Sequence, residues 1–205
     1  MFRFGITMRE TKAIGYNELR DSLAQDWGTY MSTTFPSHNW LSIPNIGLKA
    51  IDYFIKWGLN VLILSGGDSI GASENRDNTE LYLLKYAIEN NIPIIGICRG
   101  LQLIHSYFGG KIKIGEQQFI NEHRAHDHEI SLNNKTYLSN SFHVNQIVEE
   151  TLNKEFKIIA TCSKYNSIEA IKGKNILAMM WHPERKMKDK LWSNNLIIDF
   201  LINFE

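Results

Sequence analysis

Cysteine, proline and an excess of either charge are all scarce in this chain of 205 residues. It contains two cysteines, four prolines, and 22 basic side chains against 22 acidic ones. Two cysteines cannot form the dense disulfide framework of a small secreted domain, so we expect a cytoplasmic protein with free thiols. The balanced charge removes the strongest argument for a nucleic-acid partner, because neutralising many phosphates requires a basic excess.

Long hydrophobic runs are also missing. No apolar run reaches the roughly 18 residues needed to cross a bilayer, so we expect no membrane partner. The first apolar stretch is interrupted by Arg9 and Glu10 too soon for a signal peptide. Repeats and Pro/Gly/Ser linkers are absent from the sequence, which favours one domain over residues 1–205. Ordinary globular composition, 43% hydrophobic and 21% charged, indicates a sizeable core.

The first half of the sequence alternates strand and helix patterns. We expect strands at 2–8, 61–64 and 93–97, and helices at 16–31, 47–58, 78–90 and 101–108. The run at 61–64 is apolar without alternation, which is typical of a strand buried on both faces of a parallel sheet. This order predicts a parallel sheet covered by helices, with functional loops at the carboxyl ends of its strands.

The second half has a different pattern. Five short strands are expected at 128–132, 135–140, 156–161, 168–172 and 176–180, followed by a helix over 191–204. Consecutive short strands favour antiparallel pairing. The whole chain is therefore predicted to be an α/β protein with a mixed, mainly parallel sheet and helices on both faces.

A cysteine at a strand-to-helix turn is the first candidate for chemistry. Cys98 follows the apolar strand, two residues from Gly96 on one side and from Gly100 on the other. This pattern is typical of a nucleophile elbow, in which glycines allow a sharp turn and close chain approach. The amino end of the following helix would favour the thiolate over the thiol. The alternative for Cys98 is a buried cysteine that acts only as a small hydrophobe.

His182 and Glu184 supply a candidate base and its orienting group. They follow the last predicted strand, and Pro183 between them keeps the segment extended. Residues two apart on an extended chain point to the same side, so Glu184 can fix the His182 tautomer while His182 takes a proton from Cys98. An incidental surface pair is the alternative for these two residues.

Two backbone N–H groups are candidates for an oxyanion hole. Gly66 and Gly67 follow the buried strand at 61–64, and the N–H of Gly67 can reach a carbonyl group held at Cys98. The N–H of Arg99 is the natural second donor. A tight turn without function is the alternative for the glycine pair.

These motifs together resemble the class I glutamine amidotransferase superfamily. They are Gly96–Gln102 (GICRGLQ), Leu64–Gly67 (LSGG) and Trp181–Glu184 (WHPE), and their order and spacing extend over essentially the whole chain. Within the superfamily, Arg99 and the segment 140–143 (NSFH) resemble the γ-glutamyl hydrolase branch. The resemblance implies a flavodoxin-like fold of that class and a Cys98–His182–Glu184 triad.

The resemblance also implies a substrate and its contacts. Gln102, Ser141 and Phe142, with Gly66 nearby, would hold the glutamyl group, and the chemistry needs no metal or organic cofactor. The branch often has a second His and a Gln after this segment, so the role of His143 stays open. The expected activity is hydrolysis of a γ-glutamyl amide or phosphoramidate through a thioester.

Three interpretations of the leaving group remain open. The first is the nucleotide-linked γ-glutamyl-CDP-amidate, which would give L-glutamate and cytidine diphosphoramidate for capsule polysaccharide modification. The others are a γ-glutamyl-γ-aminobutyrate-type hydrolase and a glutaminase subunit supplying ammonia to a separate synthase. Arg9, just after the first strand, is the first-ranked nucleotide contact. A homodimer is left open.

A cluster of histidines does not match a metal motif. Residues 122–129 (EHRAHDHE) are predicted to form a loop running into a strand, without the cysteines or the i, i+4 histidine pair that usually announce zinc. We therefore expect no metal site, and a loop bordering the active site instead. Cys162 has no flanking glycines and is expected to be a structural thiol.

Overall fold

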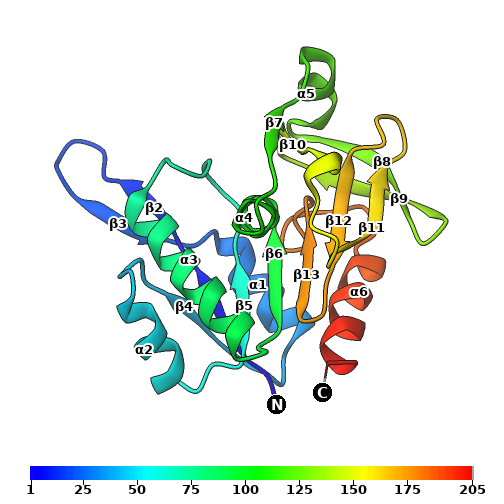
Figure 1. Cartoon of the computed structure of the whole chain (residues 1–205). Coiled ribbons are helices and arrows are strands. Elements are labelled where there is room, and N and C mark those ends of the chain that lie inside the picture. The colour runs from blue at the N-terminus through cyan, green and yellow to red at the C-terminus, as the bar shows by residue number, and fades with distance from the viewer. Residues whose placement is uncertain (205) are drawn as a thin grey trace.

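One sheet of nine strands has a parallel and an antiparallel half. The computed structural model describes residues 1–204. The parallel strands, in spatial order, are β4 (Asn39–Ile43), β1 (Arg3–Thr7), β5 (Val61–Leu64), β6 (Ile94–Ile97) and β13 (Ile176–Met179). The antiparallel half continues with β12 (Ile168–Lys172), β11 (Lys157–Cys162), β8 (His126–Leu132) and β9 (Lys135–Ser141), as Figure 1 shows. The predicted mixed α/β sheet is confirmed.

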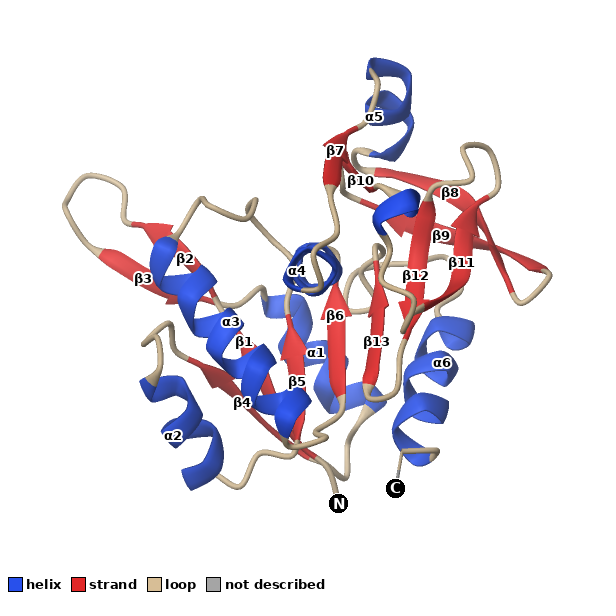
Figure 2. Ribbon diagram, in the orientation of Figure 1, coloured by secondary structure: helices blue, strands red, loops and turns tan. Residues whose placement is uncertain are grey.

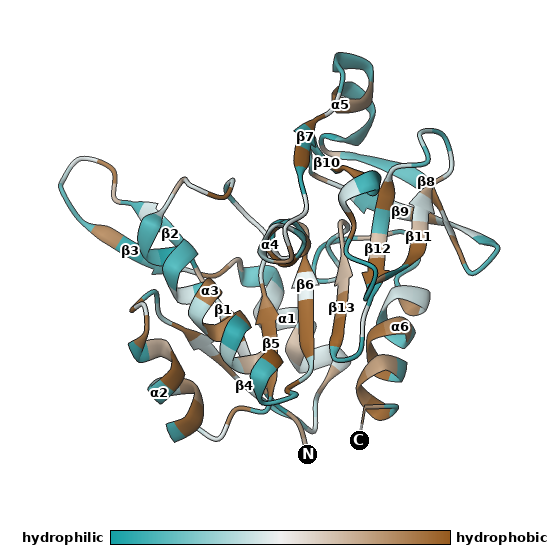
Figure 3. Cartoon of the chain, in the orientation of Figure 1, coloured by the Kyte–Doolittle hydropathy of each residue, from teal (hydrophilic) through white to brown (hydrophobic). Residues whose placement is uncertain are grey.

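Helices cover both faces of the sheet (Figure 2). One face carries α2 (Lys49–Lys56), α3 (Glu74–Glu89) and α4 (Arg99–Tyr107), and the other carries α1 (Gln25–Thr34) and α6 (Leu191–Ile202). Strand β5 contributes alternate residues to two separate cores, Val61 and Ile63 to one and Leu62 and Leu64 to the other. This explains its unbroken hydrophobic run, which Figure 3 shows in brown.

Two groups of elements and one short helix lie outside the layers. Strands β2 (Arg9–Lys12) and β3 (Leu19–Ser22) form a hairpin. We call the second group the arm: it comprises β7 (Ile112–Ile114), α5 (Gln117–His123) and β10 (Asn145–Ile147), with β7 paired to β10. The arm rises above the carboxyl ends of β5, β6 and β13 in Figure 1. A short 3-10 helix, Glu149–Thr151, follows it.

The helix predicted over 16–31 is wrong in its first half. Residues 19–22 form β3, and α1 begins only at Gln25. Leu19 in β3 is 58% exposed, whereas Trp27 and Tyr30 in α1 are buried. Pairing with β2, from Arg9 opposite Ser22 to Lys12 opposite Leu19, takes the first half of the segment into a hairpin. Tertiary pairing therefore overrode the local hydrophobic spacing.

Two other boundaries also differ from the sequence prediction. Helix α3 begins at Glu74 rather than 78, because the Ser73 side chain caps it by accepting a hydrogen bond from the Arg76 N–H at 3.3 Å. The 122–129 segment is only partly a loop, since Glu122 and His123 end α5 and β8 starts at His126. The expected strands of the second half are confirmed to within about two residues. Within residues 1–204, no helix is both long and apolar enough to span a membrane.

Candidate active site

The candidate residues gather at one edge of the parallel sheet. Strands β1, β5, β6 and β13 run in the same direction, so their carboxyl ends lie together. The segments that follow three of them carry Gly66 and Gly67, Cys98, and His182. Such an edge is where ligands bind in open α/β sheets.

Cys98 occupies the strained turn between β6 and α4. Its φ is +50° and its ψ is −101°, a backbone conformation that residues other than glycine rarely adopt. Its N–H donates to the carbonyl oxygen of Met179 at 2.7 Å, which ties the turn to β13. A Cβ at Gly100 would overlap the carbonyl oxygen of Leu64, and a Cβ at Gly96 would lie 2.6 Å from Ile104 Cδ1. Both glycines are therefore needed for the close packing of β5, β6 and α4.

His182 and Glu184 meet beside this turn. Nδ1 of His182 lies 2.7 Å from Oε1 of Glu184, and both side chains are 2% exposed. A hydrogen bond to a carboxylate places the proton on Nδ1, so Nε2 is the nitrogen free to exchange a proton with another group. The extended geometry expected around Pro183 is wrong: Pro183 and Glu184 form a turn, closed by the Arg185 N–H donating to the His182 carbonyl oxygen at 3.2 Å, and this turn brings the two side chains together.

Asn140, which the sequence analysis did not single out, clamps the backbone of His182. Its Oδ1 accepts from the His182 N–H at 2.9 Å, and its Nδ2 donates to the His182 carbonyl oxygen at 2.8 Å. Nδ2 also lies 3.2 Å from the carbonyl oxygen of Lys186. An asparagine 42 residues away in sequence carries no local signal for this role, because the contact depends on how β9 is placed in the sheet.

Burial and the interaction between Cys98 and His182 shift the pKa of both side chains. Burial acts to raise the pKa of Cys98, but hydrogen bonding and the charge of His182 outweigh it and lower that pKa below its usual value. Burial acts to lower the pKa of His182, but Cys98 and Glu184 outweigh it and raise that pKa to about 9. Both shifts favour the ion pair of thiolate and imidazolium, the form in which a cysteine is nucleophilic.

The Gly66–Gly67 turn faces this pair. A Cβ at Gly66 would lie 2.5 Å from Cε1 of His182, so the turn packs directly on the imidazole. Nη2 of Arg76 donates to the carbonyl oxygens of Ser65 and Gly66 at 2.8 and 3.0 Å. In a trans peptide the N–H points opposite to the carbonyl, so the Gly67 N–H is directed away from Arg76. Arg76 therefore fixes the orientation of the candidate oxyanion donor.

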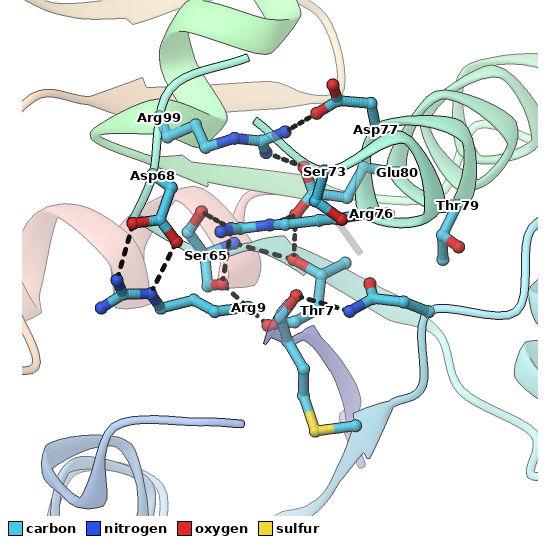
Figure 4. Close-up of polar contacts among 12 residues, drawn as sticks. Thr7, Arg9, Ser65, Asp68, Ser73, Arg76, Asp77, Thr79, Glu80 and Arg99 are labelled. Atoms are coloured by element: carbon cyan, nitrogen blue, oxygen red, sulfur yellow. Dashed lines mark hydrogen bonds and ion pairs between the residues drawn. The ribbon is translucent and has the colours of Figure 1, made fainter. Parts of the chain in front are cut away.

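A buried ionic network anchors the turn (Figure 4). Arg99 reaches Glu80 and Asp77 of α3, and Nε of Arg76 lies 2.9 Å from Oε1 of Glu80. Thr7 Oγ1 donates to Glu80 at 2.7 Å and accepts from the Ser65 N–H at 3.0 Å. The Arg99 side chain thus joins α4 to α3. Glu80 and Thr7 continue the network to the ends of β1 and β5.

The other expected substrate contacts lie around His182 and Cys98. Gln102 is buried, and its Oε1 accepts from Asn145 Nδ2 at 3.1 Å. Ser141 is buried, and its Oγ has no hydrogen-bond partner in residues 1–204. The Phe142 ring is 40% exposed and meets the His182 ring edge-on, with centroids 5.5 Å apart. His143 is buried behind it and faces Glu169, with Nε2 3.6 Å from Oε2.

Two arginines lie at the rim of this site. Arg9 pairs with Asp68 at 2.8 Å, and its Cγ and Cδ would lie 3.0 Å from a Cβ at Gly67. Arg185 stacks over the Phe142 ring, with Cζ 4.2 Å from the ring centroid. The sequence analysis missed Arg185, although its place directly after Glu184 could have identified it. Both guanidinium groups are partly exposed and suited to bind an anionic group.

The fold defines a class of proteins. A solved glutamine amidotransferase from Thermotoga maritima matches 98% of this chain and 85% of its own, with a TM-score of 0.61 at 13% sequence identity. At that identity the match shows the fold alone, and the fold is that of the class I glutamine amidotransferases, as expected.

Sequence comparison gives the family. A model of the Peptidase C26 family matches residues 65–184, a range that includes the Gly66–Gly67 turn, Cys98 and His182. The γ-glutamyl-CDP-amidate hydrolase of Campylobacter jejuni is 33% identical over 191 residues, 89% of this chain and 90% of that protein. The glutamine-hydrolysing GMP synthase of Fusobacterium nucleatum is 30% identical over 82% of this chain but 31% of that protein. The chain belongs to the Peptidase C26 family, a conclusion that confirms the resemblance seen in its motifs.

Proposed function

We propose that this protein is a cysteine hydrolase that cleaves γ-glutamyl amide or phosphoramidate bonds through a γ-glutamyl thioester. The observation that carries the proposal is the buried pair formed by Cys98 at φ +50° and His182, with Glu184 2.7 Å from the imidazole. Nucleophile, base and orienting carboxylate occur together in the order that acyl transfer requires.

The first half of the reaction forms the thioester. The Cys98 thiolate attacks the γ-carbonyl carbon, and the negative charge on the carbonyl oxygen is stabilised by the N–H groups of Gly67 and Arg99. The imidazolium of His182 then gives its Nε2 proton to the leaving nitrogen as the C–N bond breaks. The amine or phosphoramidate leaves, and the glutamyl group stays bound to sulfur.

Water completes the cycle. His182, now neutral, takes a proton from the water as its oxygen attacks the thioester carbon, and the same two N–H groups stabilise the second oxyanion. Collapse of this intermediate breaks the C–S bond and releases glutamate. Glu184 stabilises the imidazolium in both halves, and Gln102, Ser141 and Phe142 surround the glutamyl group.

We propose γ-glutamyl-CDP-amidate as the substrate, with L-glutamate and cytidine diphosphoramidate as the products in capsule polysaccharide modification. Support comes from the Campylobacter jejuni relative, which matches this chain over nearly its full length. Arg9 and Arg185 at the rim offer guanidinium groups of the kind that bind diphosphates. A γ-glutamyl-γ-aminobutyrate-type substrate, which lacks the diphosphate, would leave these arginines without a role in binding.

A panel of substrates tests this proposal. Glutamate release by the purified protein is compared on γ-glutamyl-CDP-amidate, γ-glutamyl-γ-aminobutyrate and L-glutamine, with Cys98→Ala as the blank. We expect a strong preference for the nucleotide substrate and a higher KM for it in Arg185→Ala. Preference for the γ-aminobutyrate conjugate would retain the hydrolase and contradict the proposed leaving group.

A second candidate is a glutaminase subunit that supplies ammonia to a separate synthase. It is favoured by the match to GMP synthase, in which this chain corresponds to about a third of the longer protein. Under this alternative the purified protein alone would be inactive on all three substrates, and glutamine hydrolysis would appear only with the synthase added.

A further inference from the structure

Three histidines from different elements converge on one buried carboxylate. His123 ends α5, His128 lies in β8, His143 follows β9, and Glu169 lies in β12. The His123 ring centroid is 4.3 Å from that of His128 and 5.3 Å from that of His143. Glu169 is fully buried, and His123 and His143 are at most 4% exposed. The proposed hydrolysis gives no role to His123, His128 or Glu169.

Two of these histidines present a lone pair to the cluster. Nδ1 of His123 lies 3.0 Å from the Phe119 carbonyl oxygen, and Nδ1 of His143 lies 3.0 Å from the Asn145 carbonyl oxygen. Because a carbonyl only accepts, each Nδ1 donates its proton there, and in the neutral ring Nε2 has none. Both Nε2 atoms are buried without a hydrogen-bond partner in residues 1–204.

The carboxylate of Glu169 has one occupied and one free oxygen. Oε1 accepts from Ser167 Oγ at 3.2 Å and lies 3.6 Å from Nε2 of His128. Oε2 has no hydrogen-bond partner in the described chain and lies 3.6 Å from Nε2 of His143. One nitrogen of His123, one of His143 and one oxygen of Glu169 all lie within 4.8 Å of one another. Nitrogen and oxygen atoms that have lone pairs but no hydrogen-bond partner in the described chain therefore face each other in a buried space.

A neutral imidazole and an ionised carboxylate are the forms in which these side chains bind metals, and the Nδ1 hydrogen bonds of His123 and His143 leave Nε2 of each ring as the atom that can bind.

We propose that His123, His143 and Glu169 form a zinc site. Imidazole nitrogens select zinc over magnesium or calcium, and two histidines with one glutamate are an established zinc ligand set that leaves a fourth position. Histidines that bind metals usually donate their other N–H to a carbonyl or carboxylate, as His123 and His143 do here. His128 lies beside His123, and its Nε2 is 3.6 Å from Oε1 of Glu169.

The dimensions require only a small adjustment. Tetrahedral zinc with bonds of about 2.0–2.2 Å needs ligand atoms roughly 3.3–3.5 Å apart, and the His143–Glu169 pair is at 3.6 Å. The three donors within 4.8 Å of one another would move together by about 1 Å or less. The sequence analysis excluded this site because its residues are distant in the chain and lack a local spacing pattern.

The site would connect the arm to the candidate active site. His123 belongs to the arm, and His143 follows the Ser141–Phe142 segment. The backbone carbonyl oxygen of Glu169 accepts from the Met180 N–H at 2.7 Å, directly after β13. The Phe142 ring contacts His182. The zinc ion would therefore hold the Ser141–Phe142 segment beside His182 in place, which is a structural role.

Metal binding can be measured without any assay of hydrolysis. The full-length protein is treated with a chelator, dialysed, and titrated with Zn²⁺ alone by calorimetry, with the metal content checked by mass spectrometry. We expect one zinc per chain, no heat of binding with Mg²⁺, and a melting temperature that rises with zinc. His123→Asn and Glu169→Gln should each weaken zinc binding by more than about 100-fold, since loss of an outer partner alone costs 10–100-fold.

The matched control is His126→Asn, which changes an exposed histidine of β8 outside the cluster. It should bind zinc like the wild type. Circular dichroism of each metal-free variant separates loss of the site from loss of the fold, and the wild-type stoichiometry decides the question even where a variant does not fold.

Three results would overturn the proposal. One is folded wild-type protein that binds no zinc at excess, and another is zinc binding that survives both His123→Asn and Glu169→Gln. The third uses Co²⁺ in place of zinc. A sulfur-to-cobalt charge-transfer band that disappears in Cys162→Ser would assign the ion to His123, His128 and Cys162, the neighbouring set of donors.

Discussion

The reactivity proposed for this protein depends at the residue scale on one side chain, Cys98. Its thiolate is the group that attacks the γ-carbonyl carbon in the proposed reaction, and Cys98→Ala removes the sulfur that forms the thioester. We expect turnover to fall by several orders of magnitude, about 10⁴-fold or more. Alanine is smaller than cysteine and leaves the turn between β6 and α4 intact, so circular dichroism should be unchanged. Activity retained by a folded Cys98→Ala protein would contradict the triad.

The pH dependence of the reaction should report the Cys98–His182 pair. Activity rises as Cys98 loses its proton, at a pH below the usual range of a thiol because its pKa is lowered. It falls again when His182, with its pKa raised to about 9, loses the proton needed by the leaving nitrogen. We therefore expect a bell-shaped profile of kcat/KM with its alkaline limb near pH 9, both limbs belonging to the coupled pair.

Glu184→Gln provides the control for this profile. The carboxylate of Glu184 helps raise the pKa of His182, so its neutralisation should move the alkaline limb to lower pH. Activity should also fall, because the imidazolium loses its stabilising charge. An alkaline limb that stays in place would show that a group other than His182 controls it.

At the element scale, the close contact between β5 and the start of α4 limits which residue type can occupy position 100. A Cβ on Gly100 would overlap the Leu64 carbonyl oxygen, and backbone cannot move aside cheaply. Gly100→Ala should lower the free energy of unfolding by about 1–3 kcal/mol or more, measured by denaturant unfolding. Gly28→Ala in α1 is the matched control, because its Cβ meets open space and alanine should stabilise the helix by about 0.5–1 kcal/mol. Equal stability of the two variants would contradict the packing argument.

The same elements show what could be predicted from the sequence and what could not. The strand–turn–helix around Cys98 was predictable because its signals are local: an apolar run, two flanking glycines and a helical pattern within about 15 residues. The β2–β3 hairpin was not, since Leu19 and Trp27 share a helical spacing although only Trp27 is buried. Its formation depends on pairing with residues 7 to 13 positions earlier, which local periodicity does not reveal.

Long-range contacts of the site were also outside the reach of the sequence. His182 and Glu184 were predictable as a pair because only one residue separates them, although a turn at Pro183–Glu184 and not an extended chain brings their side chains together. Asn140 and Glu169 were not, because each reaches its partners only after the register of β9 and β12 is set. The contacts of Asn140 and Glu169 therefore depend on the antiparallel half of the sheet.

At the scale of the whole molecule, one buried carboxylate connects the parallel sheet to the helices on one face. Glu80 is fully buried, pairs with Arg76 and Arg99, and accepts a hydrogen bond from Thr7 (Figure 4). Arg76 in turn holds the carbonyl oxygens of Ser65 and Gly66, which orients the Gly67 N–H. The network thus links the overall packing of β1, β5, α3 and α4 to the geometry of the candidate oxyanion hole.

Neutralising Glu80 should therefore affect stability and catalysis together. Glu80→Gln leaves two guanidinium groups buried with less opposing charge, and we expect the free energy of unfolding to fall by about 3–5 kcal/mol. The control is Glu89→Gln on the same helix. Its partner Lys85 lies 3.9 Å away, and both side chains are about 60% exposed, so its loss should change stability by less than about 0.5 kcal/mol.

At a temperature where Glu80→Gln remains folded, its kcat should also fall, because Arg76 no longer holds the Gly66–Gly67 turn firmly and the oxyanion donor loses its fixed direction. A folded Glu80→Gln protein with the wild-type kcat would show that the turn keeps its geometry without the network, and that Arg76 and Arg99 serve stability alone.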